Sequence, residues 1–332
     1  MIDIKIDVIG AEYPSLFLQV ILPLTLENIP YRFSYDFNFQ TDANILIIER
    51  GIPHRMSDYC YLTDVFNYCN QHNIKVIYAL DDDMYTGDYG YSFKWMALSS
   101  MARWLSKHSD IVLATTNQIK EKALKYNKNV VVIENSLYPG FLNYQYKGNK
   151  TKLTIGYIGT KTHDKDLKLV VEVLKHLKQK YDFDVNFYGG FYTDNIYDFI
   201  NYVDYKHNIK YPDYMANLIQ SERFDIGIAP INFSRKSTLD KSHLKYIDYM
   251  LMGAVGIYTD CIPYQKYIRN NLNGLKVNNT FNDWAYTLEL LITNENERSR
   301  MLSNAKQDIL NNHLMNNKAR QLREVIECLY KQ

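Results

Sequence analysis

The sequence has few of the residues that build metal sites or disulfide frameworks. Its 332 residues include four cysteines, and no two of them are spaced as a CxxC pair. A zinc site or a disulfide scaffold is therefore not expected, and we interpret the cysteines as reduced thiols of a cytoplasmic protein. They are Cys60, Cys69, Cys261 and Cys328.

A surplus of one charge is also lacking. The chain carries 38 basic and 37 acidic side chains, which gives a formal net charge of +1. Proteins that bind nucleic acids need a basic excess or a basic stripe on one face. A nucleic-acid partner is therefore not expected.

Long hydrophobic runs are missing as well. The longest apolar stretch, residues 16–26, is interrupted by Gln19, Pro23 and Thr25, whereas a bilayer span takes about 20 apolar residues. Residues 1–10 lack the basic and apolar regions of a signal peptide. We expect a cytoplasmic protein, and peripheral contact with the inner face of a membrane stays open.

The sequence does contain a regular alternation of short β-rich runs and helical segments. Such alternation is typical of parallel α/β sheets, and the length suggests two domains. The first half predicts strands at 4–10, 43–50, 75–80, 110–116 and 130–135, and helices at 62–72, 95–107 and 118–126. After a linker at 136–152, the pattern predicts strands at 153–159, 184–190, 224–230 and 254–260, and helices at 166–180, 242–252 and 297–330. No GxGxxG fingerprint is present, which disfavours a nicotinamide dehydrogenase.

The most informative segment runs from residue 225 to residue 260. Its pattern predicts a strand, a polar loop, a helix that begins at Ser242 and stops at Gly253, and a second strand. The Ser242 hydroxyl is predicted to cap the helix, and the N–H groups of the first turn then form a site for an anion such as a diphosphate. These N–H groups belong to His243, Leu244 and Lys245, and the surrounding cations are Arg235, Lys236, Lys241 and Lys245.

Two acids flank the start of this helix. Asp240 lies just before it and Asp248 lies nearly two turns inside it. Their spacing places both on roughly one side, about 12 Å apart. One carboxylate can then hold a sugar hydroxyl and the other a ribose, with the phosphates between them.

The segment resembles the E-x7-E region of retaining glycosyltransferases of the GT-B fold, the family-4-like group. Here the two acids are Asp240 and Asp248, so both carboxylates are kept but are shorter by one methylene. The Lys-Ser-x-Leu-Lys run at 241–245 is similar to a subset in which lysines flank the helix start. The resemblance implies that Asp240 contacts the donor sugar, that the N–H groups of His243 and Leu244 bind the diphosphate, and that Asp248 binds the ribose.

A second stretch, residues 154–170, resembles the strand, loop and helix that begin the second domain of the same enzymes. Gly156 and Gly159 let the backbone approach the donor, and Lys165 stands at the place of a phosphate-binding lysine. The rest of the donor loop in this comparison comprises Thr160, His163, Asp164 and Asp166. Residues 255–278 also fit the pattern, so the resemblance covers most of 150–315 and the first half only loosely.

Three consecutive acids, Asp81, Asp82 and Asp83, follow the strand predicted at 75–80 and therefore lie at a carboxyl edge, where α/β sites form. One interpretation is a divalent-metal site of the DxD type. The second, which we prefer, is that these acids line the acceptor side of the active site. The third is a solvated acidic turn. Because adjacent carboxylates repel one another, at least one of them is expected to have a raised pKa.

The resemblance implies an α/β GT-B architecture in which two Rossmann-like domains face each other across a cleft. Residues 1–140 would form the acceptor-side domain and residues 150–315 the nucleotide-sugar domain. Residues 316–332 would form a helix that packs back towards the first domain.

The function implied by the resemblance is transfer of a sugar, with retention, from a nucleoside-diphosphate sugar such as a UDP-sugar to a glycan, lipid-linked or protein acceptor in bacterial-type surface glycan synthesis. Asp240, Lys165 and Asp82 would be catalytic, and Lys165, Lys241 or Lys245 would stabilise the leaving diphosphate. No metal and no cofactor is expected. Two alternatives stay open: a nucleotide-sugar epimerase on the same fold, and a non-catalytic GT-B partner subunit.

Overall fold

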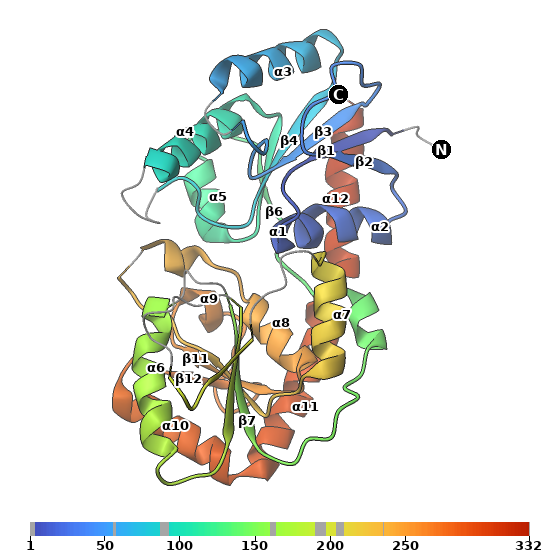
Figure 1. Cartoon of the computed structure of the whole chain (residues 1–332). Coiled ribbons are helices and arrows are strands. Elements are labelled where there is room, and N and C mark those ends of the chain that lie inside the picture. Colours follow the sequence, from blue (N-terminus) through green and yellow to red (C-terminus); the bar gives the residue numbers. More distant parts are fainter. Residues whose placement is uncertain are drawn as a thin grey trace. The chain divides into compact units, whose positions relative to one another are not determined.

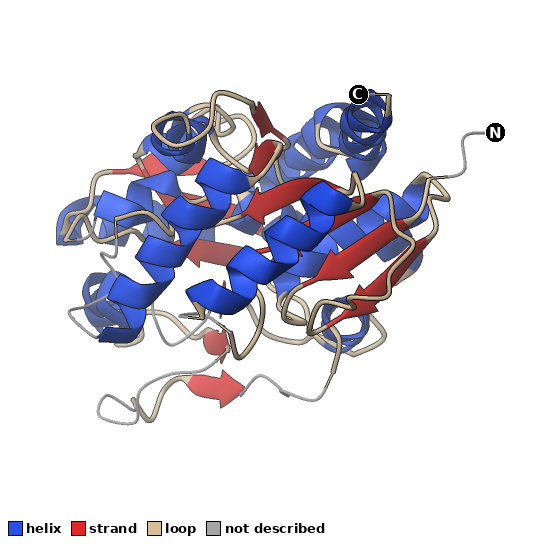
Figure 2. Ribbon diagram, turned by 90° about the horizontal axis from the view of Figure 1, so that it is seen from above, coloured by secondary structure: helices blue, strands red, loops and turns tan. Residues whose placement is uncertain are grey.

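The computed structural model describes residues 4–55, 58–86, 93–159, 164–189, 197–203, 209–234 and 236–331. The chain divides into two compact units. The first comprises residues 1–138, 235–242 and 315–332, and the second comprises 139–234 and 243–314. Each unit contains a sheet of six parallel strands with helices around it (Figures 1 and 2), so the predicted α/β class is confirmed.

The sheet of the first unit has the strand order β2-β1-β3-β4-β5-β6. The strands are β1 (Ile6–Ile9), β2 (Tyr31–Ser34), β3 (Ile45–Glu49), β4 (Lys75–Leu80), β5 (Ile111–Ala114) and β6 (Val130–Val132). The strand order reverses between β1 and β3, so the switch point of the sheet lies at the carboxyl ends of these two strands. Every strand of this sheet except β2 was predicted. The edge strand β2 has no buried residue: its side chains alternate between half-buried and exposed.

The helices of the first unit are α1 (Pro14–Leu16), the π-helical turn η1 (Phe17–Ile21), α2 (Leu22–Leu26), α3 (Tyr59–Gln71), α4 (Phe93–His108), α5 (Asn117–Ala123), the 3-10 helix η5 (Lys236–Asp240) and α12 (Met315–Tyr330). Although α12 is last in the sequence, it packs against α2. Its buried face consists of Met315, Ala319, Leu322, Ile326 and Leu329. The helical region predicted at 297–330 therefore consists of two helices, α11 (Glu295–Asn312) and α12, in different units.

The sheet of the second unit has the order β12-β11-β10-β7-β8-β9, and its switch point lies between β7 and β10. Its strands are β7 (Thr154–Ile158), β8 (Asp184–Tyr188), β9 (Asn201–Val203), β10 (Ile226–Ala229), β11 (Val255–Thr259) and β12 (Leu275–Val277). The four predicted strands are confirmed. The two strands that were missed, β9 and β12, are three-residue edge strands.

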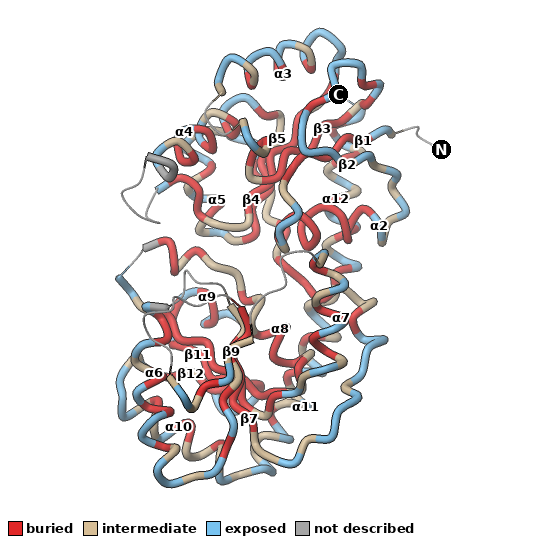
Figure 3. The backbone as a smooth tube through the Cα atoms, viewed as in Figure 1, coloured by how far each residue is buried: buried red, intermediate tan, exposed pale blue. Residues whose placement is uncertain are grey.

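The helices of the second unit are η2 (Pro139–Asn143), α6 (Asp164–Leu177), α7 (Tyr211–Ser221), α8 (Leu244–Leu251), α9 (Ile262–Gln265), α10 (Phe281–Thr293) and α11 (Glu295–Asn312). The apolar face of α6 is buried against the sheet, and it contains Leu167, Val170, Val171, Leu174 and Leu177. Figure 3 shows that the central strands form the buried interior of each unit. No helix in the described part of the chain is long and apolar enough to cross a bilayer.

Candidate functional site

Helix α8 carries the second acid of the resemblance, and it begins later than the sequence predicted. The helix starts at Leu244, and its N-cap residue is His243, without a side-chain capping bond. The predicted cap by Ser242 is wrong, because its hydroxyl instead accepts a hydrogen bond from Asn135 Nδ2 at 2.9 Å. The N–H groups that the helix start can offer a ligand are therefore those of Leu244 and Lys245, because the N–H of Tyr246 donates to the carbonyl of His243 at 2.8 Å. The predicted stop is confirmed: Gly253 follows the helix in the left-handed region with φ +74°.

Asp248 is a buried acid of the second unit. Its side chain lies one turn inside α8 and is 8% exposed. Its Oδ1 atom has no hydrogen-bond partner within the described residues. Burial raises the pKa of Asp248 to about 7, although Lys245 on the same helix opposes this shift. An unsatisfied buried carboxylate costs stability, so its presence points to a ligand that supplies the missing donor.

Lys245 links α8 to the switch point of the second sheet. Its ammonium donates a hydrogen bond to the carbonyl of Ile158, the last residue of β7, at 2.6 Å. It also lies 4.7 Å from the centroid of the Tyr157 ring. The first turn of α8 and the loop that follows β7 are therefore held together at one sheet edge, the place where α/β folds bind phosphorylated ligands.

The glycines at this edge make a close backbone contact. Gly159 donates its N–H to the carbonyl of Tyr188 at 2.8 Å. Gly189, with φ +123°, lies so close that a Cβ atom there would be 1.5 Å from the carbonyl oxygen of Gly159. Only glycine fits at position 189, and this packing fixes where the predicted donor loop begins.

Lys165, the predicted phosphate lysine, is exposed near the start of α6. Next to it, the buried Asp166 accepts a hydrogen bond from the N–H of Asn232 at 2.7 Å, which ties the loop after β10 to the start of α6. The predicted donor residues Thr160 and His163 lie outside the described residues, as does Arg235.

The segment that carries the first acid, residues 235–242, belongs to the first unit. Asp240 ends η5 and is 4% exposed. Its carboxylate binds the ammonium of Lys122 on α5, and its carbonyl accepts a hydrogen bond from the Thr116 hydroxyl at 3.0 Å. Burial raises the pKa of Asp240, and Lys122 opposes the shift. This acid lies on a different element from Asp248, so the two are not neighbours on one helix.

The three consecutive acids are held by different cations. The Arg50 guanidinium forms a two-pronged bond with Asp81, at 2.6 and 2.8 Å, and a third bond to Asp82 at 3.2 Å. Lys241 Nζ lies 3.5 Å from the other Asp82 oxygen. The pKa of Asp81 is raised, as expected for one of the three; burial is the main cause, Arg50 opposes it, and repulsion from Asp82 adds to it.

Asp83 has a mainly structural environment. Its fully buried carboxylate accepts hydrogen bonds from the N–H groups of Tyr85 and Thr86 and from the Thr86 hydroxyl, and it also binds Lys122. Lys122 therefore bridges Asp83 and Asp240. Within the described ranges, no three His, Cys, Asp or Glu side chains are grouped so that they could hold a metal ion.

Several residues of these networks were not predicted from the sequence: Glu49, Arg50, Lys122 and Asn135. Glu49 and Arg50 end the strand predicted at 43–50, so the rule that drew attention to the acids after β4 could also have found them. Lys122 had no comparable signal, because its partners are 39 and 118 residues away in the chain.

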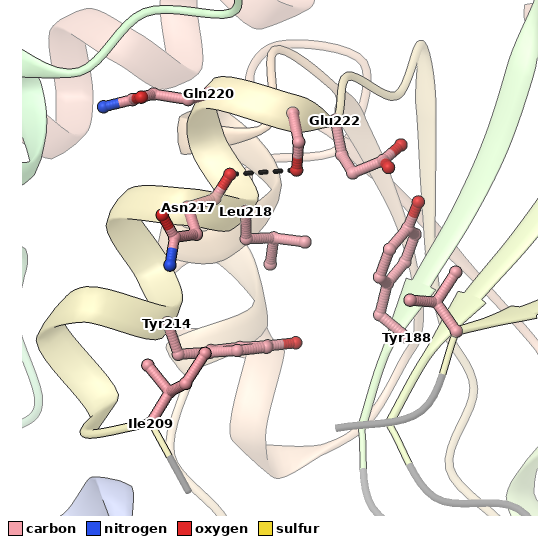
Figure 4. A pocket seen from close by; sticks show the side chains of 9 residues that line it. Tyr188, Ile209, Tyr214, Asn217, Leu218, Gln220 and Glu222 are labelled. Carbon is pink, nitrogen blue, oxygen red and sulfur yellow. Dashed lines mark hydrogen bonds between the residues drawn. The ribbon is translucent and has the colours of Figure 1, made fainter. Parts of the chain in front are cut away.

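A pocket of about 520 Å³ lies between α7 and the carboxyl ends of β8 and β9 (Figure 4). The rings of Tyr188 and Tyr214 line it with Leu218, and the Glu222 carboxylate lies near the Tyr188 hydroxyl. Burial, and then the Glu222 carboxylate, raise the pKa of Tyr188. No predicted site residue lines this pocket, but aromatic faces with a few polar groups suit a sugar ring or a base.

Sequence comparison finds a family match in the second half of the chain. Residues 168–324 match the sequence model of a family described as "Glycosyl transferase-like". This match includes α8 and Asp248. No curated protein matches the sequence.

The whole chain has the fold of solved GT-B structures. It superposes on sucrose-phosphate synthase from Thermosynechococcus elongatus with a TM-score of 0.71 and 11% identity over 99% of both chains. It superposes on Anabaena Alr3699/HepE, solved with UDP and glucose, with a TM-score of 0.70 and 10% identity over 98% of this chain and 100% of that one. For a glycosyltransferase from Rickettsia africae, the TM-score is 0.67 at 16% identity over 100% of both chains. These superpositions establish the GT-B fold, and at such low sequence identity they show the fold alone.

Proposed function

We propose that this protein is a glycosyltransferase that moves a sugar from a nucleoside-diphosphate sugar to a hydroxyl of a carbohydrate, lipid-linked or protein acceptor, with retention. The observation that carries the proposal is the buried Asp248 carboxylate, whose Oδ1 atom has no hydrogen-bond partner within the described residues. It lies on α8, within the region that matches a glycosyl transferase-like family. A ribose hydroxyl would supply the donor that this oxygen lacks.

In this proposal the second unit binds the donor. The N–H groups of Leu244 and Lys245 and the ammonium of Lys165 contact the diphosphate, and Gly159 allows its close approach. The pocket beside the ends of β8 and β9 has room for a further part of the donor. Anabaena HepE was solved with UDP and glucose, so UDP-glucose is the first donor to test.

The chemistry that we assign to these groups is electrostatic. When the bond between the sugar carbon and the diphosphate oxygen breaks, negative charge grows on the leaving diphosphate. Helix N–H groups and lysines that are already in place stabilise this charge without rearranging, which lowers the barrier. We assign this role to α8 and the lysines rather than to a metal ion, and we assign the acceptor to the first unit, where Asp81 and Asp82 lie.

Donor turnover tests the proposal. The wild-type protein is incubated with UDP-glucose, UDP-N-acetylglucosamine, GDP-mannose and dTDP-glucose in EDTA, and release of the nucleoside diphosphate is measured. We expect slow release with one of them, and a loss of at least about 100-fold in Asp248→Ala. The exposed helix residue Asp64 provides the control Asp64→Asn, which should behave as the wild type.

The result also separates the alternatives. An epimerase would convert the donor sugar without releasing nucleotide. A non-catalytic partner would do neither. Release that requires manganese and is lost when Asp81 and Asp82 are replaced would move the donor site to the first unit and overturn the proposal.

A further inference from the structure

The switch point of the first sheet carries a carboxyl group that no part of the proposed donor chemistry uses. Glu49 is the last residue of β3, and Gly10 directly follows β1. Their backbones adjoin, since a Cβ atom at Gly10 would lie 3.2 Å from Glu49 Cβ and 3.3 Å from its Oε2. In open parallel sheets, this crevice at the strand ends is where ligands bind.

Glu49 and its neighbour Ser15 are buried without satisfied polar atoms. Glu49 is 1% exposed and Ser15 is 4% exposed. Neither carboxyl oxygen of Glu49, nor the Ser15 hydroxyl, has a hydrogen bond of normal geometry within the described residues. The nearest cation to Glu49 is Arg50, whose Nε lies 3.5 Å from Oε1. The Ser15 hydroxyl is close enough to lower the pKa of Glu49, but one hydroxyl cannot satisfy both carboxyl oxygens, so at least one of these oxygens lacks a partner.

Burial favours the neutral form of Glu49. Burial raises its pKa to about 8. The Arg50 guanidinium opposes this rise, Asp81 adds to it, the adjacent Ser15 hydroxyl opposes it, and Asp82 adds to it. At neutral pH the group is therefore mostly a carboxylic acid, which can donate one hydrogen bond and accept another. A sugar hydroxyl both donates and accepts, so the two are complementary.

The backbone at Arg50 and the nearby ring of Tyr13 support a preformed site. Arg50 has φ +57°, an uncommon conformation for a residue with a side chain. Its N–H bonds to the carbonyl of Ala79 at 3.0 Å, and its carbonyl accepts a bond from the Tyr78 hydroxyl at 3.1 Å. The half-exposed ring of Tyr13 lies 5.7 Å from the guanidinium. The π-helical turn that follows Ser15, residues 17–21, is of a kind common at functional sites.

The charged side chains near Glu49 also disfavour anions. The guanidinium of Arg50 is already bonded to Asp81 and Asp82, and Lys241 pairs with Asp82. Among the described residues of this group, two cations face two carboxylates, so no excess of positive charge remains for a phosphate or a carboxylate. We propose that Glu49 and Ser15 form a subsite for the hydroxyl groups of an uncharged sugar, the acceptor end in the reaction. The identification of this sugar as the acceptor rests on the proposed function, but its binding can be measured without turnover.

The test is saturation-transfer NMR on the full chain. The neutral probes are methyl α-D-glucopyranoside and the methyl glycoside of N-acetylglucosamine, and the anionic probes are glucose 6-phosphate and glucuronic acid. In the wild type, neutral probes should bind at pH 6.5 and about tenfold more weakly at pH 9, where the carboxyl has ionised. Glu49→Gln keeps a donor and an acceptor, so it should bind at both pH values with no pH dependence.

Ser15→Ala should weaken binding of the neutral probes, whereas the exposed Glu121→Gln should match the wild type. The inference is overturned if no neutral probe binds, if the anionic probes bind better, or if Glu49→Gln keeps the pH dependence of the wild type. Binding of UDP, followed in parallel, reports on the proposed donor site. Failure of UDP binding with intact glycoside binding would therefore refute the proposed function and not this subsite.

Discussion

At the scale of single residues, Asp248 should lower the stability of the free protein at neutral and alkaline pH. Its folded-state pKa of about 7 lies above its usual value of 3.8. The folded state therefore holds the proton more tightly, and stability falls as the pH rises from about 4 to 7. Asp248→Asn should raise the free energy of unfolding by a few kcal/mol at pH 8 and by less at pH 5. Urea unfolding at both pH values measures this, and an equal effect at both would contradict the assignment.

Lys122, unlike Asp248, should stabilise the folded protein. Lys122→Met leaves two buried carboxylates, Asp83 and Asp240, without their shared cation. Loss of one partner from a buried ion pair costs about 3–5 kcal/mol. The cost should be largest at pH 8 and smaller at pH 5, because burial raises the pKa of Asp240 and its carboxylate binds a proton more readily as the pH falls. Chemical denaturation checks this against Lys125→Met, an exposed lysine just beyond the same helix, which should change stability by less than about 0.5 kcal/mol.

These residues also show what one sequence can predict. The acids Asp81 and Asp248 stood out because they follow a strand or lie on an amphipathic helix, which are local patterns. Their partners did not. Arg50 binds an acid 31 residues away, and Lys122 binds one 118 residues away. Such pairs form only when strand ends meet at one sheet edge, and no local pattern records which cation arrives there.

At the scale of elements, the start of α8 depends on a contact that helix-capping rules do not describe. Ser242 was predicted to cap the helix, since serine before an apolar periodic run is a strong N-terminal signal. In the structure its hydroxyl accepts from Asn135, just beyond β6, and the helix starts two residues later. A tertiary partner therefore outweighed the local preference. The edge strands β2, β9 and β12 escaped prediction because each contains a polar residue and none has the continuous apolar run that marks an equally short strand such as β6.

A double-mutant cycle distinguishes the two roles of Ser242. If its hydroxyl bonds to Asn135, Ser242→Ala and Asn135→Ala should be non-additive, with a coupling free energy of about 1 kcal/mol. A true cap would give additive effects. Thr280 provides the comparison, because its hydroxyl does cap α10 by accepting from the N–H of Asp283. Thr280→Ala should cost about 1 kcal/mol and show no coupling to Asn135→Ala.

At the scale of the whole molecule, the alternation of strands and helices was enough to predict two parallel α/β halves. The alternation reflects the repeating βαβ unit, and that unit survives at 10–16% identity to solved structures. Two segments from the second half of the chain also belong to the first unit. Residues 235–242 and 315–332 belong with the first unit through contacts such as Lys122 with Asp240 and Arg323 with Glu27. No composition change marks residues 235–242, whereas a helix at 316–332 that packs towards the first domain was expected from the family resemblance.

Helix α12 should be required for the first unit to fold. Its apolar face packs on α2, and Arg323 Nε binds the Glu27 carboxylate at 2.6 Å. Removal of residues 315–332 would expose both apolar faces, at a cost of roughly 1.5–3 kcal/mol for each large buried side chain. We expect the truncated chain to lose cooperative unfolding or to aggregate. Arg323→Ala should cost only about 1 kcal/mol, and a truncated chain with wild-type melting behaviour would contradict this account.

The central claim is that the second unit binds a nucleoside diphosphate without help from the acids of the first. The most direct measurement is the melting temperature in EDTA with UDP, GDP or dTDP at about ten times the dissociation constant, which should stabilise the protein by about 1.4 kcal/mol, or about 2 °C. We predict a shift with one nucleotide that is lost in Asp248→Ala and kept in Asp64→Asn. A shift that requires manganese and disappears when Asp81 and Asp82 are replaced, or no shift with any nucleotide, would contradict the claim.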